Sequence, residues 1–510
     1  MSLGTTAAVS LVGLSGYVVE VQAQLAYSIP GFALVGLPDA ALSESRDRVR
    51  AAVLSSRLGW PNRKITVNLS PASLPKSGSA FDVAIAVAVL AGAGEIPQDG
   101  QLSRVVHIGE LGLDGRLQPV RGVLPMVNAA VAAGYPDVVV PTADVTEASL
   151  VPGARVRGAT SLAEVVALHG GEPEGIPDVE PVRPARIAAA RREPGDLADV
   201  IGQTLPRLAL EIAAAGGHHL LLMGPPGTGK TMLAARLPTI LPDLTETEAV
   251  DVTSVHSITG TFDAAGGLIT RPPFEDPHHT ATRAAVVGGG SGMPRPGSAS
   301  RAHCGVLFLD ETPEFAVNVL ESLREPLENG ELVIHRSGGI ARFPARFQLV
   351  LAANPCPCGM ASGKGLSCSC TPMARRRYAA KMSGPLLDRV DLQVEVEALG
   401  RAGLQGERGE GSAVVAARVA VAREAARARL AGTPWTTNAQ VSGTWLRERI
   451  RSRWEIMREV DLALDAGTIS LRGADRVLRV AHTIADLAGR GEPTAADIGQ
   501  ALLLRNGRLT

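Results

Sequence analysis

The first third of the chain alternates short valine-rich runs with longer stretches of helical hydrophobic spacing. RKITVNL (63–69) and DVVVP (137–141) have the length and β-branched composition of strands. SRDRVRAAVLSS (45–56) and AFDVAIAVAVLAG (80–92) instead place apolar residues at helical intervals. This alternation predicts an α/β domain, which we assign to residues 1–170.

A break in this pattern separates a second domain from the first. Residues 171–195 mix proline with charge and have no apolar period, so they predict a linker. Beyond it, the apolar runs HHLLLM (218–223), GVLFLDE (305–311) and FQLVLAANP (347–355) are separated by helical or glycine-rich segments. That order is typical of a parallel sheet with crossover helices and predicts an α/β domain at residues 196–399.

The remainder of the chain, residues 400–510, has helical spacing and almost no strand candidates. It therefore predicts an all-helical third domain. A chain of 510 residues has room for about three compact domains, in agreement with this division.

Composition limits the partners and the location of the protein. The net charge of -1 argues against a generally basic surface, so nucleic acid would have to be held by local Arg and Lys residues. The N-terminus lacks the charged segment and cleavage site of a secretory signal, and no apolar run approaches the ~20 residues of a membrane helix. We therefore expect a cytoplasmic protein without a membrane partner.

One loop carries the pattern of a nucleotide site. The strand-like run ending at Met223 leads through GPPGTGKT into the helical stretch MLAARLPTIL (232–241). In such a loop, glycines let backbone N–H groups surround phosphate oxygens, the lysine reaches the β and γ phosphates, and the threonine hydroxyl binds Mg²⁺. The order of strand, loop and helix disfavours a chance glycine turn, so the sequence predicts bound ATP with Mg²⁺. The predicted nucleotide contacts are Gly224, Pro225, Pro226, Gly227, Thr228, Gly229, Lys230 and Thr231.

The next two apolar strands end in residues suited to hydrolysis. Asp310 would hold Mg²⁺ together with Thr231, and Glu311 would polarise the attacking water. Asn354 ends the following strand, where its amide could orient that water or read the γ phosphate. The sequence therefore predicts that these residues form the catalytic group.

Two kinds of arginine are candidates for contacts with the nucleotide. Arg389 follows a short predicted helix and could act as a finger on a neighbouring subunit's nucleotide, and a salt bridge with Asp388 or Asp391 is the alternative. The helical domain offers three arginines that could reach the nucleotide of their own subunit: Arg472, Arg476 and Arg479. Arg472 is the favoured candidate, and solvated helix charges are the alternative.

One loop, NPCPCGMASGKGLSCSC (354–370), holds four of the five cysteines. They form two CxC pairs: Cys356, Cys358, Cys368 and Cys370. Four thiolates could complete a tetrahedral Zn²⁺ site and fix this loop, and free thiols or redox disulfides are the alternatives. The adjacent His278 and His279 lack a third ligand at a recognisable spacing, so we expect a structural or DNA-proximal role for them.

The chain resembles the AAA+ ATPases in the order of four motifs that precede the helical domain: GPPGTGKT, GVLFLDE, AANP and LLDRVDL. Gly202 and Gln203 look like the adenine-pocket segment of that class. PHHTATRAAVVGGG (277–290) and NPCPCG (354–359) are similar to the magnesium-chelatase-like branch, specifically the bacterial ComM (YifB) competence family. The resemblance spans nearly the whole chain, since GLPDAALSESRDRVRAAV (36–53) looks like the N-terminal domain of that family.

The resemblance implies a hexameric ring that hydrolyses ATP and moves along DNA as a helicase. It further implies branch migration in homologous recombination, as in natural transformation, with single-stranded and branched DNA as partners. A chelatase-type or protein-remodelling AAA+ ATPase that does not act on DNA is the alternative. A RadA-like recombination factor is a third class, but there the domain order is reversed.

Residues 328–348 predict a β-hairpin around the sequence RSGG. In related ATPases the hairpin at this place projects into the pore of the ring. His335, Arg336 and Arg342 are therefore expected to contact DNA phosphates, and a surface hairpin with solvated arginines is the alternative. The glycine-rich stretch 286–298 looks like a second mobile loop that faces DNA.

The N-terminal domain also resembles the Lon protease fold. PKSGSA (75–80) lies where Lon carries its nucleophilic serine, but an ungapped match puts Ala80 rather than Ser79 at that position. Leu124 stands where the resemblance expects the lysine that would activate the nucleophile. We therefore predict a degenerate, non-catalytic module that contacts DNA or a partner.

Overall fold

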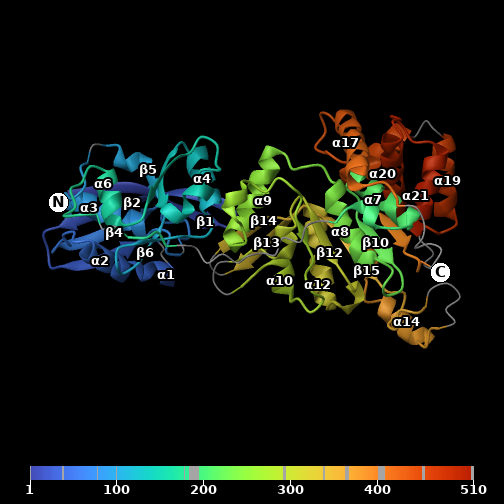
Figure 1. Ribbon diagram of the computed structural model, residues 1–510, viewed down its shortest axis with the longest axis horizontal. Coiled ribbons are helices and arrows are strands. Elements are labelled where there is room, and N and C mark those ends of the chain that lie inside the picture. The colour runs from blue at the N-terminus through green and yellow to red at the C-terminus, as the bar shows by residue number, and fades with distance from the viewer. Residues whose placement is uncertain are drawn as a thin grey trace.

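The computed structural model describes residues 2–36, 39–76, 78–98, 100–176, 179–182, 195–290, 294–336, 339–361, 367–399, 408–450 and 454–506. The chain forms an N-terminal part, a central part and a C-terminal group of helices, which follow one another along the molecule (Figure 1). The mixed α/β class, the parallel central sheet and the helical C-terminal part are confirmed. Among the described helices, none combines the length and the apolar character needed to cross a membrane.

A seven-stranded mixed sheet forms the N-terminal part, in the order β3-β4-β2-β1-β5-β8-β9. Its strands are β1 (Ser2–Val12), β2 (Ser15–Ala26), β3 (Gly31–Val35), β4 (Lys64–Ser70), β5 (Val105–His107), β8 (Asp137–Pro141) and β9 (Arg155–Ala159). A separate pair of short strands is formed by β6 (Glu110–Leu111) and β7 (Leu117–Gln118). The central strands β1 and β2 form a long antiparallel hairpin, whereas β5, β8 and β9 run parallel.

Helices cover this sheet where the apolar pattern predicts them. They are α1 (Ala40–Ser43), α2 (Ser45–Ser55), α3 (Asp82–Ala93), α4 (Val123–Ala132), α5 (Val145–Ala148) and α6 (Leu162–Leu168). The α3 helix is buried around nearly its whole circumference, because it packs on β1 and β2 and is covered by α2. Its continuous run of alanine and valine follows from that position.

A five-stranded parallel sheet forms the central part, in the order β11-β12-β15-β10-β16. Its strands are β10 (Leu220–Met223), β11 (Phe274–Glu275), β12 (Val306–Leu309), β15 (Gln348–Ala353) and β16 (Leu392–Glu395). Leu220 and Leu222 face one apolar cluster and Leu221 faces another, so both faces of the sheet are buried. The carboxyl ends of β10, β12 and β15 therefore meet at one edge, where open α/β sheets bind ligands.

Helices and a second hairpin complete the central part. The helices are α7 (Thr204–Gly216), α8 (Lys230–Ile240), α9 (Glu246–Thr259), α10 (Arg283–Val287), α11 (Ser298–Arg301), α12 (Val317–Ser322), α13 (Arg324–Asn329), α14 (Pro372–Ala379) and α15 (Gly384–Leu387). The hairpin strands are β13 (Glu331–Arg336) and β14 (Gly339–Pro344). The predicted hairpin thus forms immediately before β15.

Among the described residues, the C-terminal part consists of helices that share an apolar cluster with the central sheet. They are α17 (Ser412–Arg429), α18 (Gly443–Ile450), α19 (Trp454–Asp465), α20 (Leu471–Leu487) and α21 (Ala495–Asn506). The α17 helix packs on α7, α8 and α20, and α21 packs on β16. This packing holds the helical part directly against the sheet that carries the nucleotide motif.

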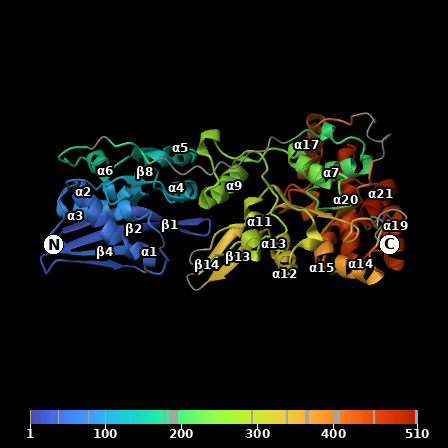
Figure 2. The ribbon, with the colours of Figure 1, turned by 60° about the horizontal axis from the view of Figure 1, so that its bottom comes forward.

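Described residues of the N-terminal part contact the central part around α4 and at the turn between β1 and β2. The α4 helix packs on α9, and the Ser257 hydroxyl of α9 donates to the Glu147 carboxylate at 2.5 Å. The same carboxylate accepts from the Leu124 N–H at 3.0 Å. Figure 2 shows the second contact, where the turn after β1 meets β14 and the Leu14 N–H donates to the Arg342 carbonyl at 3.4 Å.

Candidate nucleotide site and cysteine cluster

The loop between β10 and α8 has a backbone that requires its glycines. Gly227 and Gly229 have φ angles of +77° and +88°, in the left-handed region that favours glycine. A Cβ added at Gly224 would collide with the carbonyl oxygen of Val396. The α8 helix begins at Lys230, so the loop presents the N-terminus of a helix, an arrangement that binds phosphate.

The Lys230 ammonium connects this loop to the end of β15. It donates to the carbonyls of Gly224 at 2.7 Å and Pro225 at 2.8 Å, and to Oδ1 of Asn354 at 3.2 Å. Burial lowers the pKa of Lys230. The lysine and the amide, predicted on separate elements, therefore meet in the folded chain.

The expected magnesium ligands also meet. Oγ1 of Thr231 donates to Oδ2 of Asp310 at 2.6 Å, which joins the start of α8 to the end of β12. A hydroxyl and a carboxylate in this position fit the oxygen ligands that Mg²⁺ prefers. Gln203, in the expected adenine segment, donates to the carbonyls of Thr228 at 3.4 Å and Glu397 at 2.7 Å, so it lies against the same loop.

Glu311 has a partner that sequence reasoning missed. The Glu311 carboxylate lies 3.2 Å from Nδ1 of His279. The neighbouring His278 instead places Nδ1 2.9 Å from Oγ1 of Thr280. The spacing of metal ligands in the sequence carries no signal for this pair, because the partner of His279 is an acid far along the chain. His279 therefore belongs to the candidate catalytic group.

Arg389 is buried in the single chain and has partners within it. Its Nη1 donates to the Pro385 carbonyl at 2.6 Å, and Nη2 forms an ion pair with Glu328. Of the two alternative partners considered from the sequence, Asp388 and Asp391, the latter instead forms an ion pair with Arg476 at 2.5 Å. A finger role for Arg389 stays a prediction, and it requires the exchange of Glu328 for a neighbour's phosphate.

The three arginines of α20 differ in their surroundings. Arg472 is exposed and lies near Arg389. Burial is the main cause that lowers the pKa of Arg389, and the positive charge of Arg472 contributes to the same shift. Arg476 is held by Asp391, and Arg479 is partly buried near the same carboxylate. The proposed contact between Arg472 and the nucleotide of its own subunit stays a prediction.

The hairpin presents part of the predicted DNA-binding group to solvent. The Arg342 side chain is 61% exposed and forms an ion pair with Glu331 at 2.7 Å. His335 is exposed on the neighbouring strand. The Arg336 side chain and residues 291–293 of the predicted second loop lie outside the described residues. Contact with DNA stays a prediction for all of these positions.

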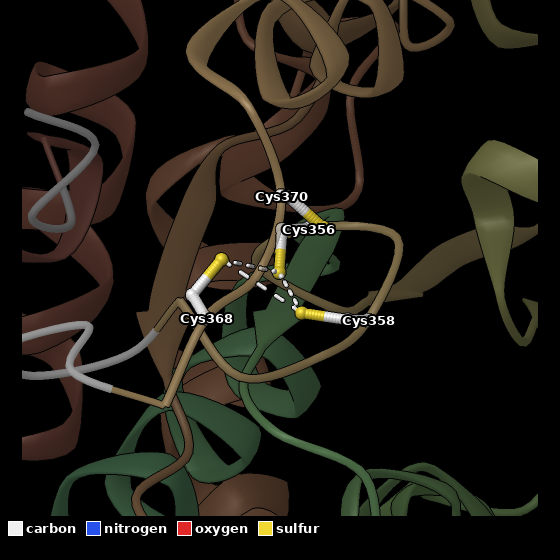
Figure 3. Close-up of side chains that lie close together, drawn as sticks. All are labelled: Cys356, Cys358, Cys368 and Cys370. Carbon is white, nitrogen blue, oxygen red and sulfur yellow. Dashed lines mark hydrogen bonds between the residues drawn. The ribbon is translucent and has the colours of Figure 1, made fainter.

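The four cysteines of the loop converge (Figure 3). Their sulfurs all lie within 4.8 Å of one another, with Cys356 3.3 Å from Cys358 and 3.7 Å from Cys368. A tetrahedral zinc ion with Zn–S bonds of about 2.3 Å would separate its sulfurs by about 3.8 Å, so the cluster, which Cys370 completes, fits zinc. The cysteines are free thiols in the structure. Residues 362–366 of the loop lie outside the described residues.

The residues of the Lon-like motif are engaged separately. The Ser79 hydroxyl donates to the Glu110 carboxylate, and the buried Lys76 ammonium donates to the Pro71 carbonyl. Leu124 is fully buried in an apolar cluster. Among its described hydrogen bonds Ser79 thus has no lysine partner, and the non-catalytic role stays a prediction.

Models of one family match three successive stretches of the chain. Subunit ChlI of Mg-chelatase matches residues 19–144, the magnesium chelatase subunit ChlI model matches residues 196–404, and its C-terminal model matches residues 409–505. Competence protein ComM of Haemophilus influenzae is 39% identical over 504 residues, which cover 98% of this chain and 97% of that protein. The chain belongs to the magnesium-chelatase-like ComM/YifB family.

Other relatives support the same assignment. Uncharacterized protein YifB of Escherichia coli is 39% identical over 490 residues, 96% of this chain and 94% of that protein. An uncharacterized protein of Mycobacterium tuberculosis is 50% identical over 508 residues, 99% of each chain. The magnesium-chelatase 38 kDa subunit of Rhodobacter capsulatus matches only 34% of this chain, at 29% identity. The near full-length matches therefore relate the chain to the ComM/YifB family more closely than to that subunit.

Proposed function

We propose that this protein is an ATP-hydrolysing, ring-forming DNA motor that acts as a helicase and promotes branch migration in homologous recombination, as in natural transformation. The ATPase part rests on one observation: Lys230, Thr231, Asp310 and Asn354 meet at one edge of the parallel sheet. The DNA part is supported by near full-length similarity to a protein named Competence protein ComM. We place this activity in the cytoplasm.

In the proposed reaction, the loop N–H groups and Lys230 hold the phosphates. Thr231 and Asp310 would hold Mg²⁺, which would supply positive charge to neutralise the phosphates. Glu311 polarises the attacking water as general base, and Asn354 orients that water or reads the γ phosphate. The contact between Lys230 and Asn354 supports these roles, because it places the amide beside the residue that reaches the γ phosphate.

The proposed ring, expected to be a hexamer, completes the site between subunits. Arg389 acts on the neighbouring nucleotide, and Arg472 contacts the nucleotide of its own subunit. His335, Arg336 and Arg342 line the pore and bind DNA phosphates. Repetition of a few arginines around the ring creates a basic channel although the net charge of each chain is only -1.

The cysteine cluster is proposed to bind Zn²⁺. Its sulfur spacing supports this proposal, and four thiolates suit a structural zinc site. Metal analysis of natively purified protein should find about one zinc ion per chain. Protein that is folded and active without zinc would contradict the assignment.

The decisive experiment is ATP hydrolysis by the purified protein with and without single-stranded and forked DNA, followed by strand displacement and branch migration assays. We expect DNA to stimulate hydrolysis, and Lys230→Ala to abolish it. Hydrolysis that ignores every DNA would refute the pore assignment and favour the chelatase-type or protein-remodelling alternative. Activity that requires partner subunits and a porphyrin would identify the chelatase type.

A further inference from the structure

The first pair of cysteines lies on a tight turn that packs against the phosphate loop. In this turn the Gly359 N–H donates to the Cys356 carbonyl at 2.9 Å. Gly359 is buried and has a φ angle of +78°. A Cβ added there would lie 2.5 Å from Cδ and 2.7 Å from Cγ of Pro226. The cysteine turn and the phosphate loop are therefore in contact, with no room for a side chain between them.

The cysteine turn and the phosphate loop each lie next to a residue that accepts a hydrogen bond from Lys230. Asn354, two residues before the buried Cys356, accepts a hydrogen bond from the Lys230 ammonium at 3.2 Å. Pro226 follows Pro225, whose carbonyl accepts from the same ammonium at 2.8 Å. A shift of the cysteine turn would therefore reach two groups that position this lysine.

The second pair of cysteines ties the turn to α14. Cys368 and Cys370 directly precede that helix, and Sγ of Cys368 lies 3.7 Å from the sulfurs of Cys356 and Cys358. A metal bound by all four thiolates joins the two pairs. Because metal bonds supply the order of small loops that lack an apolar core, the position of the turn depends on the metal.

We propose that the metal-bound cysteine turn braces the phosphate loop, so that occupancy of the four-cysteine site controls the affinity for nucleotide. This inference rests on the proposed zinc and ATP sites. With the metal bound, the turn packs on Pro226 and keeps the loop in the form that surrounds phosphate. After metal loss the turn leaves Pro226, and the affinity for nucleotide falls.

A glycine pair tests the contact itself. Gly359→Ala introduces a Cβ that collides with Pro226, whereas Gly432→Ala adds a Cβ at a φ angle of +81° with no atom within 4 Å. Both variants carry the strain of a left-handed alanine, but only the first disturbs the brace. We expect Gly359→Ala to retain zinc and to bind a fluorescent ATP analogue about tenfold more weakly, and Gly432→Ala to bind it like the wild type. Equal affinities of the two variants would overturn the proposal.

A second substitution tests whether Pro226 transmits the effect. Alanine at position 226 lacks the Cγ and Cδ atoms that the added Cβ would meet. The double variant Gly359→Ala/Pro226→Ala should therefore lose less binding free energy for the nucleotide analogue than the two single variants lose when their losses are added. Additive losses would show that the collision with Pro226 is not the cause.

Metal removal completes the test on the full chain. Chelator-treated protein and Cys358→Ser, each checked for folding by circular dichroism, should lose zinc and nucleotide affinity together, and added zinc should restore both in the chelated protein. Zinc-free folded protein that binds nucleotide with unchanged affinity would overturn the brace, while leaving the ATP site intact. Wild-type protein that holds zinc but binds no nucleotide would instead refute the proposed ATPase.

Discussion

One imidazole contacts the candidate general base. Nδ1 of His279 lies 3.2 Å from the Glu311 carboxylate, and the side chains are 32% and 52% exposed. A hydrogen bond to a charged group contributes about 1.5–3 kcal/mol of stability. Because both side chains are partly exposed to solvent, we expect the contribution of this pair to lie at or below the lower end of that range. We expect His279→Ala to lower the turnover number about tenfold and to leave nucleotide affinity unchanged, because the acid loses its orientation.

Two further histidine variants separate positioning from a general disturbance. In His279→Asn the amide nitrogen takes the place of Nδ1, so much of the turnover should return. His278→Ala is the matched control, since that ring contacts Thr280 rather than Glu311. Steady-state hydrolysis and equilibrium binding provide the measurements, and equal losses in both alanine variants would contradict the assignment.

Asp144 makes the stability of the N-terminal part depend on pH. The pKa of its carboxyl group is raised to about 7, chiefly by burial and to a smaller extent by Glu147, while the Val120 N–H at 3.0 Å offsets part of the rise. The folded state thus binds this proton more tightly than the unfolded state, so stability is lost as pH rises from about 4 to about 7. In thermal unfolding, Asp144→Asn should flatten this dependence, and the exposed Asp465→Asn should not.

At the scale of elements, the β1–β2 turn is fitted to the hairpin. Gly13 has a φ angle of +66°, and a Cβ there would lie 2.6 Å from the carbonyl oxygen of Arg342. Gly13→Ala should therefore displace the turn and increase hydrogen exchange at the amides of β14 about tenfold. Gly134→Ala has the same kind of backbone strain without any atom within 4 Å, so it should leave β14 unchanged. Identical exchange in both variants would count against the contact.

Features encoded in one short stretch could be predicted, because their parts follow one another along the chain. The phosphate loop, the hairpin and the cysteine cluster are of this kind. The contacts of His279 with Glu311 and of Arg389 with Glu328 could not, since tertiary packing alone brings these residues together. Alternating valine runs likewise indicate strands but not the order of the N-terminal sheet, whose long central hairpin was not anticipated.

At the scale of the whole molecule, the proposed ring makes each site depend on two chains. Arg389→Ala should lower hydrolysis about a thousandfold and preserve nucleotide binding, because the finger acts on the transition state of the neighbouring site. Mixing Arg389→Ala with Lys230→Ala should restore part of the hydrolysis that each variant lacks alone, because an intact phosphate loop then meets an intact finger at some of the interfaces. Lys230→Ala subunits lose their own site but still offer the finger. Hydrolysis by the mixture that does not exceed the sum of the two variants alone would exclude a finger role.

The hydrogen bond between the Leu14 N–H and the Arg342 carbonyl connects the hairpin mechanically to the N-terminal part. In the proposed motor, any movement of the hairpin would pull on a strand pair that continues into the seven-stranded sheet. Either the N-terminal part moves together with the hairpin as one rigid body, or the 3.4 Å hydrogen bond breaks and re-forms in every cycle of hydrolysis. A covalent tether between the turn and the hairpin would preserve DNA movement in the first case and stop it in the second.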